Sequence, residues 1–199
     1  MADRDEEQAW VEQSRQGDFD AFENLVRRYQ RMIYSLTFRM TGSAADAEDL
    51  AQETFIQAFQ HLHSYRSEAR FASWLYRIAV NQCLNWKKRD LRRTEIHKEW
   101  GRRIADTDPR DESVSHHVQE ALLKLPPKQR AAVVLTTYEG LSHAEAARVL
   151  KCSEATVSWR VFAARMKLKK LLRALNQSSC YERCRSRQAA EIRSPYGTG

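Results

Sequence analysis

The sequence contains few residues that interrupt helices and few that could build a covalent or metal-bound framework. Among 199 residues there are only 6 glycines, 4 prolines and 4 cysteines. The glycines and prolines are concentrated between long periodic runs, which argues against a β-sandwich or a repeated βαβ fold. The cysteines do not occur in pairs with the spacing of zinc ligands, so a zinc site is not expected. A disulfide framework is not expected either. The sequence therefore predicts an all-α protein with no metal and no cofactor.

Long apolar runs are absent as well. No run approaches the roughly 20 residues that a membrane-spanning helix needs. The N-terminus, MADRDEEQAW, is acidic and has no apolar core of the kind found in signal peptides. We therefore expect a cytosolic protein that does not insert into a membrane.

The charged residues form blocks of alternating sign. Residues 1–60 carry 6 basic and 12 acidic side chains, and residues 61–104 carry 11 and 4. Residues 105–123 carry 1 basic and 5 acidic side chains, whereas residues 124–175 carry 11 and 3. Two basic blocks on either side of an acidic segment predict two separate contacts with a polyanion. The acidic first block is instead expected to bind a basic protein surface.

Residues 71–93 combine an apolar helix face with a face suited to opened DNA. Apolar residues recur at helical spacing from Phe71 to Trp86. The opposite stripe carries cations and amides, and two aromatic residues flank it: Arg77, Asn81, Asn85, Lys88 and Arg92, with Trp74 and Tyr76 beside them. Cations bind phosphate, aromatic rings stack on unpaired bases, and asparagine can hydrogen-bond a base edge. An amphipathic helix with core aromatics and a basic end would show the same pattern.

A helix predicted from Ala44 to about His61 presents an acidic face. Asp49, Gln52 and Glu53 stand at i, i+3 and i+4 and therefore share one side of this helix. Such a face can dock a basic helix, hold a divalent metal or face water. The carboxylates follow no ligand-loop pattern and no histidine joins them, so the pattern favours protein docking over a metal site.

Helical periodicity is lost after about residue 94 and resumes near residue 118. We interpret residues 95–117 as an acidic, flexible linker between two small helical domains, residues 1–94 and 118–175. Residues 176–199 form a polar tail for which disorder is expected, and regulation through its Cys180 and Cys184 is a further hypothesis.

The second domain carries the signature of a helix-turn-helix. Residues 128–139 are expected to form one helix with Tyr138 on its inward side. Ser142 and Glu145 then make a capping box for a short helix, and Ser153 can cap a second helix that runs into a basic end. In a helix-turn-helix the second helix enters the major groove of DNA.

Four segments of the chain form recognisable motifs: DAEDLAQETFIQAF at 46–59, RFASWLYRIAVNQCLNWKKR at 70–89, LPPKQRAAVVLTTYEGLSHAEAARVL at 125–150 and CSEATVSWRVFAARMKL at 152–168. The first two resemble regions two-point-two to two-point-four of the extracytoplasmic-function (ECF) sigma factors, the smallest group of bacterial RNA polymerase specificity subunits. The last two resemble region four of the same family. The resemblance implies a region-two helical bundle and a region-four helix-turn-helix joined by a linker.

The resemblance also implies a partner for each part of the first domain. In ECF sigma factors the first motif docks on the clamp helices of the polymerase β′ subunit, which assigns Asp49, Gln52 and Glu53 to polymerase binding. The second motif reads and melts the promoter minus-ten element, and a loop at about residues 64–70 forms part of a pocket for a flipped base. This assigns six residues to minus-ten DNA: Arg77, Asn81, Asn85, Lys88, Trp74 and Tyr76.

Region four of the family meets the polymerase β flap and binds the minus-thirty-five element in the major groove. The matching candidates are His143, Thr156, Ser158, Trp159, Arg160, Phe162, Ala163 and Arg165. Family members commonly carry Lys or Arg at the positions of Ser158 and Ala163, so base reading here is expected to shift towards thymine methyl groups and groove shape. We expect His143, Arg160 and Arg165 to contact phosphate. Trp159 could instead pack on a neighbouring helix or on a regulator.

We therefore predict a non-enzymatic sigma factor that binds core polymerase and both duplex and melted promoter DNA, and family habit implies an anti-sigma factor as a further partner. One alternative is a stand-alone helix-turn-helix regulator that binds duplex DNA as a dimer. A second alternative is a metal-dependent nuclease or other enzyme that uses the carboxylates of residues 46–53.

Overall fold

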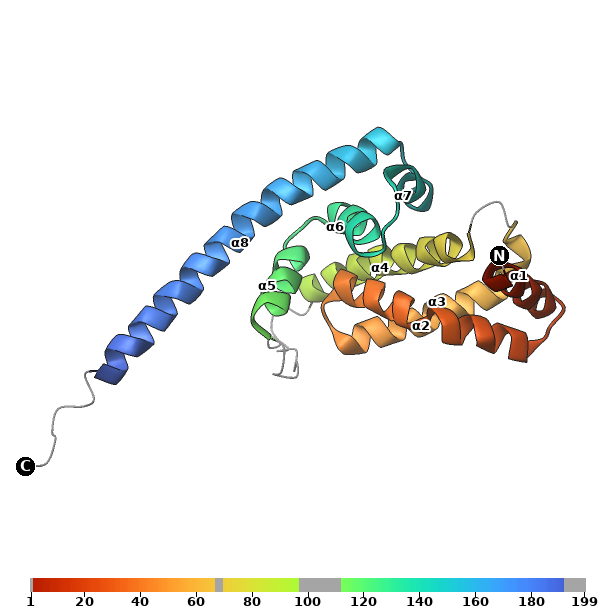
Figure 1. Cartoon of the computed structure of the whole chain (residues 1–199), viewed down its shortest axis with the longest axis horizontal. Coiled ribbons are helices and arrows are strands. Elements are labelled where there is room, and N and C mark those ends of the chain that lie inside the picture. Colours follow the sequence, from red (N-terminus) through yellow and green to blue (C-terminus); the bar gives the residue numbers. More distant parts are fainter. Residues whose placement is uncertain (1, 67–69, 97–111, 192–199) are drawn as a thin grey trace, which may run out of the picture.

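The computed structural model describes residues 2–66, 70–96 and 112–191, with side chains placed for residues 5–66, 70–86 and 117–173. These residues form helices and turns and contain no strand, which confirms the all-α prediction. The helices are α1 (Ala2–Arg15), α2 (Phe19–Thr41), α3 (Ala44–Gln60), the short η1 (Leu62–Ser64), α4 (Phe71–Ile96), α5 (Glu112–Leu123), α6 (Pro127–Val133), η2 (Val134–Tyr138), α7 (His143–Leu150) and α8 (Glu154–Glu191) (Figure 1). No helix in this part of the chain is long and apolar enough to cross a membrane.

Side-chain caps mark where α2 and α3 begin. The Asp18 carboxylate accepts hydrogen bonds from the first turn of α2, and the Ser43 hydroxyl accepts one from the Asp46 amide at 3.3 Å. Gly42 ends α2 with φ at 77°, a conformation that disfavours other residues. A Cβ at Gly42 would also collide with Leu123 of α5. The end of α2 is therefore tightly packed against the second half of the chain.

The first four helices form a bundle around aliphatic and aromatic side chains. Leu25, Ile33 and Leu36 of α2 are fully buried, as are Phe71 and Leu75 of α4. In each helix these residues recur at helical spacing and so share one apolar face, as predicted for residues 71–86. Burying side chains of this size stabilises the fold by about 2 kcal/mol each relative to exposure.

In the second half, α6 differs from the expected single helix over residues 128–139. The chain changes into a π-helical turn at Val134–Tyr138 and then reverses at Gly140, where φ is 68°. The wider turn places Tyr138 at the surface, 40% exposed, rather than on the inward side. Its ring lies instead under the guanidinium of Arg39, 4.3 Å from the ring centroid.

Helices α5 to α7 pack on α2 and α4, and we refer to this packing as the closed arrangement (Figure 1). Arg130 of α6 is 3% exposed and donates to the carbonyl oxygens of Leu122 at 2.8 Å and Leu125 at 3.2 Å. It also donates to Leu123 and, across the two halves, to Met40. Burial lowers the pKa of this guanidinium. One side chain thus satisfies carbonyls at the C-terminal ends of both α2 and α5.

Replacing Arg130 with methionine should lower the free energy of unfolding by about 3 kcal/mol. The substitution keeps the apolar stem but leaves several buried carbonyls without a donor, which is expensive in a low-dielectric interior. Urea unfolding followed by circular dichroism would measure the change, with the exposed Arg31→Met as the matched control. An unchanged midpoint for Arg130→Met would show that these hydrogen bonds do not hold the closed arrangement.

The backbone of α8 continues to Glu191, whereas the sequence predicts a disordered tail from residue 176. No glycine or proline occurs between Gly140 and Pro195, so nothing in the sequence interrupts the helix there. Figure 1 shows α8 running away from the bundle. The side chains of Cys180 and Cys184 lie outside the described residues.

Candidate nucleic-acid interface

Helix α3 carries the predicted acidic face. Asp49, Gln52 and Glu53 are all exposed on it, and the opposite side of the helix is buried in the bundle. Glu53 accepts a hydrogen bond from Gln57 at 3.0 Å. Ile56 lies one turn from Gln52 and is 53% exposed, which places an apolar side chain beside the carboxylates. Ile56 was not among the predicted contacts, because its exposure follows from how α3 packs and not from its spacing.

The predicted metal alternative finds no support in this region. Nowhere in the described part of the chain do three or more His, Cys, Asp or Glu side chains come together in a way that could hold a metal ion. The carboxylates of Asp49 and Glu53 are exposed on α3 and belong to no such group. An acidic surface with an apolar centre is better suited to a basic protein surface.

Helix α4 presents amides and a cation on the side away from the core. Arg77, Asn81 and Asn85 are exposed, while Cys83 on the other side is buried. Burial raises the pKa of the Cys83 thiol to about 12, so this cysteine is a packing residue and not a nucleophile. Lys88 continues the stripe in sequence, but its side chain lies outside the described residues. Three of the predicted positions therefore share one open face.

The two aromatic candidates on α4 differ in their surroundings. Trp74 is half-buried, and its ring packs against Tyr65 at 5.4 Å and Phe71 at 5.5 Å between centroids. Tyr76 is only 5% exposed, and its hydroxyl donates to Glu139 at 2.7 Å. Burial and this carboxylate raise the pKa of Tyr76. In the closed arrangement Tyr76 is thus a contact between the two halves, which agrees with the alternative of a core aromatic. Its role as a stacking surface for DNA stays a prediction.

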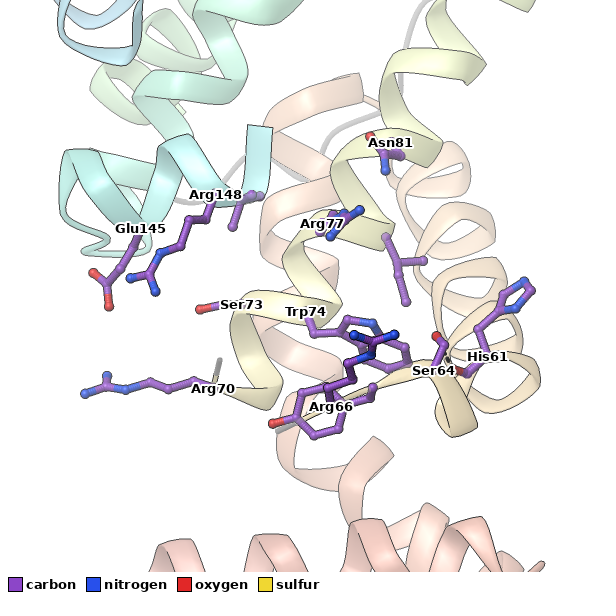
Figure 2. Close-up of a pocket in the computed structure, with 13 residues that line it drawn as sticks. His61, Ser64, Arg66, Arg70, Ser73, Trp74, Arg77, Asn81, Glu145 and Arg148 are labelled. Carbon is purple, nitrogen blue, oxygen red and sulfur yellow. Dashed lines mark hydrogen bonds between the residues drawn. The ribbon is translucent and has the colours of Figure 1, made fainter. Parts of the chain in front are cut away.

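A cavity of about 660 Å³ lies between α4 and α7. Figure 2 shows Glu145 and Arg148 of α7 on one side of it, with Arg70, Ser73 and Arg77 on the other. The segment before α4 contributes further lining residues: His61, Ser64, Tyr65 and Arg66. The open face of α4 is therefore covered in part by the second half of the chain.

The capping box and the helix-turn-helix are present as predicted. The Ser142 amide donates to the Glu145 carboxylate at 2.9 Å, and the Glu145 amide donates to the Ser142 hydroxyl at 3.2 Å. Hydrogen bonds from Ser142 lower the pKa of Glu145. Lys151 adopts a left-handed φ of 48° between α7 and α8, which turns the chain into the second helix.

The polar candidates at the start of α8 are largely engaged within the protein. The Ser158 hydroxyl lies 2.8 Å from His143 Nδ1, and the Thr156 hydroxyl lies 2.8 Å from that of Ser153. Arg160 approaches the Cys152 sulfur at 3.5 Å. The contact between His143 and Ser158 joins α7 to α8, and the other two hold side chains of α8 against the turn before it.

The outward side of α8 is mainly apolar near its start. Trp159 is 62% exposed and Phe162 is 65% exposed, so most of both side chains is open to a partner. Met166, one turn further, is 58% exposed and was not predicted. Ala163 is half-buried and Arg165 is exposed. This surface offers apolar contacts flanked by positive charge, as expected for reading thymine methyl groups.

Three arginines line the cavity in addition to Arg77: Arg66, Arg70 and Arg148. Arg66 and Arg70 belong to the loop at about residues 64–70 that was expected to form part of a base pocket, although neither was named as a contact. Nothing in the sequence indicates Arg148, because its place beside α4 depends on how the two halves pack.

Comparison with known families matches both halves of the chain. Residues 25–94 match the model of Sigma-70 region 2, and residues 116–168 match that of Sigma-70 region 4. The chain is 36% identical over 179 residues to the ECF RNA polymerase sigma factor SigW of Bacillus subtilis, covering 83% of this chain and 96% of the relative. It is 38% identical over 164 residues to the ECF sigma factor SigM of Mycobacterium tuberculosis, covering 80% and 81%.

Solved structures show the same architecture. CnrH, solved in complex with the cytosolic domain of CnrY, is similar with a TM-score of 0.65 and 28% identity, covering 85% of this chain and 98% of CnrH. The sigma factor RpoE of Bartonella quintana, solved with the anti-sigma factor NepR, has a TM-score of 0.67 and 23% identity, covering 76% and 96%, and this likeness supports the fold alone.

Proposed function

Because the chain belongs to the ECF sigma factors of bacterial RNA polymerase, we propose that it binds core polymerase, directs it to specific promoters and helps to open the minus-ten region. The observation that carries this proposal is the separation of three surfaces on one chain. An acidic face lies on α3, an amide and arginine face on α4, and an exposed apolar and basic face on α8. The first suits a basic protein, and the other two suit DNA. The chain is proposed to act in the cytoplasm, where the polymerase is, by binding polymerase and promoter DNA and not by catalysis.

The α3 face is proposed to hold the polymerase β′ clamp helices. Asp49, Gln52 and Glu53 supply charge and hydrogen bonding, and Ile56 supplies an apolar anchor between them. Charged residues around a small apolar centre give both orientation and affinity at a protein interface. Region four is proposed to meet the β flap.

The α4 face is proposed to bind the melted minus-ten strand. Unstacking a base costs a few kcal/mol, and stacking on an aromatic ring returns about 1–3 kcal/mol per base. A factor without ATP hydrolysis can keep DNA open only by trapping bases in this way. Asn81 and Asn85 offer amides to base edges, Arg77 offers charge to phosphate, and Trp74 offers a half-buried ring beside them. Lys88 and Tyr76 remain proposed contacts, and Tyr76 requires that the closed arrangement open.

Helix α8 is proposed to enter the major groove at the minus-thirty-five element. Trp159, Phe162 and Ala163 would make apolar contacts there, with Arg165 on phosphate. The remaining candidates on α7 and α8 are proposed to orient the helix-turn-helix and contact the backbone: His143, Thr156, Ser158 and Arg160. The division into residues 1–94 and 118–175, joined by residues 95–117, then gives each DNA element its own domain.

We further propose that a protein regulator keeps the chain inactive. The similar CnrH was solved with the cytosolic domain of CnrY, and the closed arrangement already covers part of the α4 face. A regulator that bound both halves in the closed arrangement would increase the population of that arrangement.

One experiment separates this function from a stand-alone regulator. Purified protein and core polymerase, alone and combined, are incubated with labelled promoter fragments in gel-shift and footprinting assays. We expect a sequence-specific footprint over the two promoter elements only for the combination. Specific binding of a dimer of the protein alone to a palindromic duplex would favour the stand-alone regulator instead.

A further inference from the structure

The cavity between α4 and α7 gathers positive charge from both halves of the chain. Arg66, Arg70 and Arg77 belong to the first half, and Arg148 comes from α7 in the second half (Figure 2). All four side chains are exposed. None of them forms a hydrogen bond or an ion pair with a residue whose side chain the structure describes. Four guanidinium groups therefore line one cavity, and among its described lining residues only Glu145 offers two of them, Arg70 and Arg148, an opposite charge.

The acidic residues of the cavity do not balance this charge. Among its thirteen described lining residues, Glu145 is the sole carboxylate. Its oxygen Oε2 accepts hydrogen bonds from the Ser142 amide at 2.9 Å and hydroxyl at 2.8 Å. The charges of Arg70 and Arg148 also help to lower its pKa, but one carboxylate cannot neutralise four arginines. Like charges gathered in a concave site repel one another and raise the local concentration of anions. The site is thus suited to an anion of several charges.

The size and walls of the cavity narrow the class of ligand. A volume of about 660 Å³ is within the range that holds a nucleotide-sized molecule. Arginine binds phosphate with two parallel hydrogen bonds, and the half-buried ring of Trp74 and the amide of Asn81 lie in the same wall. We propose that the cavity binds a small polyphosphate, either inorganic or attached to a nucleoside, and that this ligand holds the chain in the closed arrangement.

The proposed ligand would compete with promoter DNA, because Arg77 and Asn81 cannot face both at once. This competition rests on the proposed function, but binding of the ligand itself does not. Arg148 distinguishes binding of the proposed ligand from binding of promoter DNA, because it lines the cavity only when α7 lies against α4. A ligand that contacted Arg148 would bind the closed arrangement better than an open one and would shift the population towards it.

The test is isothermal titration calorimetry of the full chain at low salt with two probes, inorganic tripolyphosphate and GTP. We expect saturable binding of one probe molecule per chain, weakened about tenfold by Arg148→Ala. The matched control is Arg31→Ala, which removes an exposed arginine of α2 outside the cavity and should leave the affinity within about twofold. Tighter binding of GTP would identify a nucleotide site, and equal affinities an inorganic polyphosphate site; both support the proposal.

A second variant tests whether the closed arrangement is required. Tyr76→Phe removes the hydrogen bond to Glu139 without changing the shape of the core or the lining of the cavity. We expect it to weaken probe binding several-fold while circular dichroism shows an unchanged helix content. Absence of saturable binding to the wild type, or equal losses in Arg148→Ala and Arg31→Ala, would overturn the proposal. Promoter-directed transcription by the wild-type chain would survive either result, so the proposed function stands or falls separately.

Discussion

Replacing Asp49 and Glu53 together with alanine should lower the affinity of the chain for core polymerase at least about tenfold. Both carboxylates are exposed on α3, and their removal leaves the buried side of that helix intact. The loss therefore comes from the interface and not from unfolding. Fluorescence anisotropy with labelled protein and core polymerase would measure it at two salt concentrations, since removing interface charge should also reduce the dependence on salt.

The matched control removes two carboxylates elsewhere. Glu23 of α2 and Glu154 of α8 are exposed, and Glu23 makes only a surface ion pair with Arg27. We expect Glu23→Ala with Glu154→Ala to bind core polymerase nearly as well as the wild type. Equal affinities of the two double variants would remove the docking role of the α3 face. Ile56→Ser, added as a single change, should reproduce part of the loss if the apolar centre of the face is buried on binding.

Replacing Asn81 and Asn85 together with alanine should impair opening of the promoter and spare its initial recognition. If each amide contributes one hydrogen bond to an unpaired base, about 2 kcal/mol is lost, which shifts the equilibrium towards closed complexes about 30-fold. Both side chains are exposed, so folding should not change. Permanganate footprinting of unpaired thymines reports opening, and DNase footprinting on the same complexes reports recognition.

The control variant for this prediction changes a residue on the same helix. Gln82 is half-buried beside the face, and Gln82→Ala should leave permanganate reactivity close to that of the wild type. Normal reactivity in the Asn81 and Asn85 double variant would refute the role of the α4 face in melting. A loss of DNase protection at the minus-thirty-five element would instead place these residues in initial binding.

The local structure of the chain could be predicted from the sequence, because caps and helix faces depend on residues that are close together in the sequence. Asp18, Ser43 and Ser142 cap the helices that follow them, and Gly42 ends α2, as their residue types require. The acidic face of α3 and the amide stripe of α4 follow from spacing along single helices. The same holds for the helix-turn-helix.

The packing of the two halves could not be predicted, because it rests on contacts far apart in the sequence. Arg130 reads as a surface cation in a basic block, yet it is buried against carbonyls of α2 and α5. Tyr76 reads as a stacking ring on the DNA face, yet it is bonded to Glu139, which is 63 residues away. Arg148 enters a cavity beside α4 for the same reason. Spacing within one helix carries no information about which other helix will cover it.

These long-range contacts bear directly on activity. In the closed arrangement α7 lies over part of the α4 face, so the proposed binding of melted DNA to this face requires α7 to move away from α4. The interface that would open contains a buried arginine and a tyrosine–glutamate hydrogen bond, which water can replace, and also part of one hydrophobic cluster that spans both halves, whose exposure costs free energy. Binding to polymerase would supply the free energy for this change.

The most direct test of the account is transcription from genomic DNA by purified core polymerase with and without the chain, with start sites mapped by sequencing of the transcripts. We expect a set of new start sites that depends on the chain, shares sequence elements at two fixed distances upstream, and disappears with Asp49→Ala and Glu53→Ala. Transcripts identical with and without the chain, from a protein that still binds intact duplex DNA alone, would contradict it.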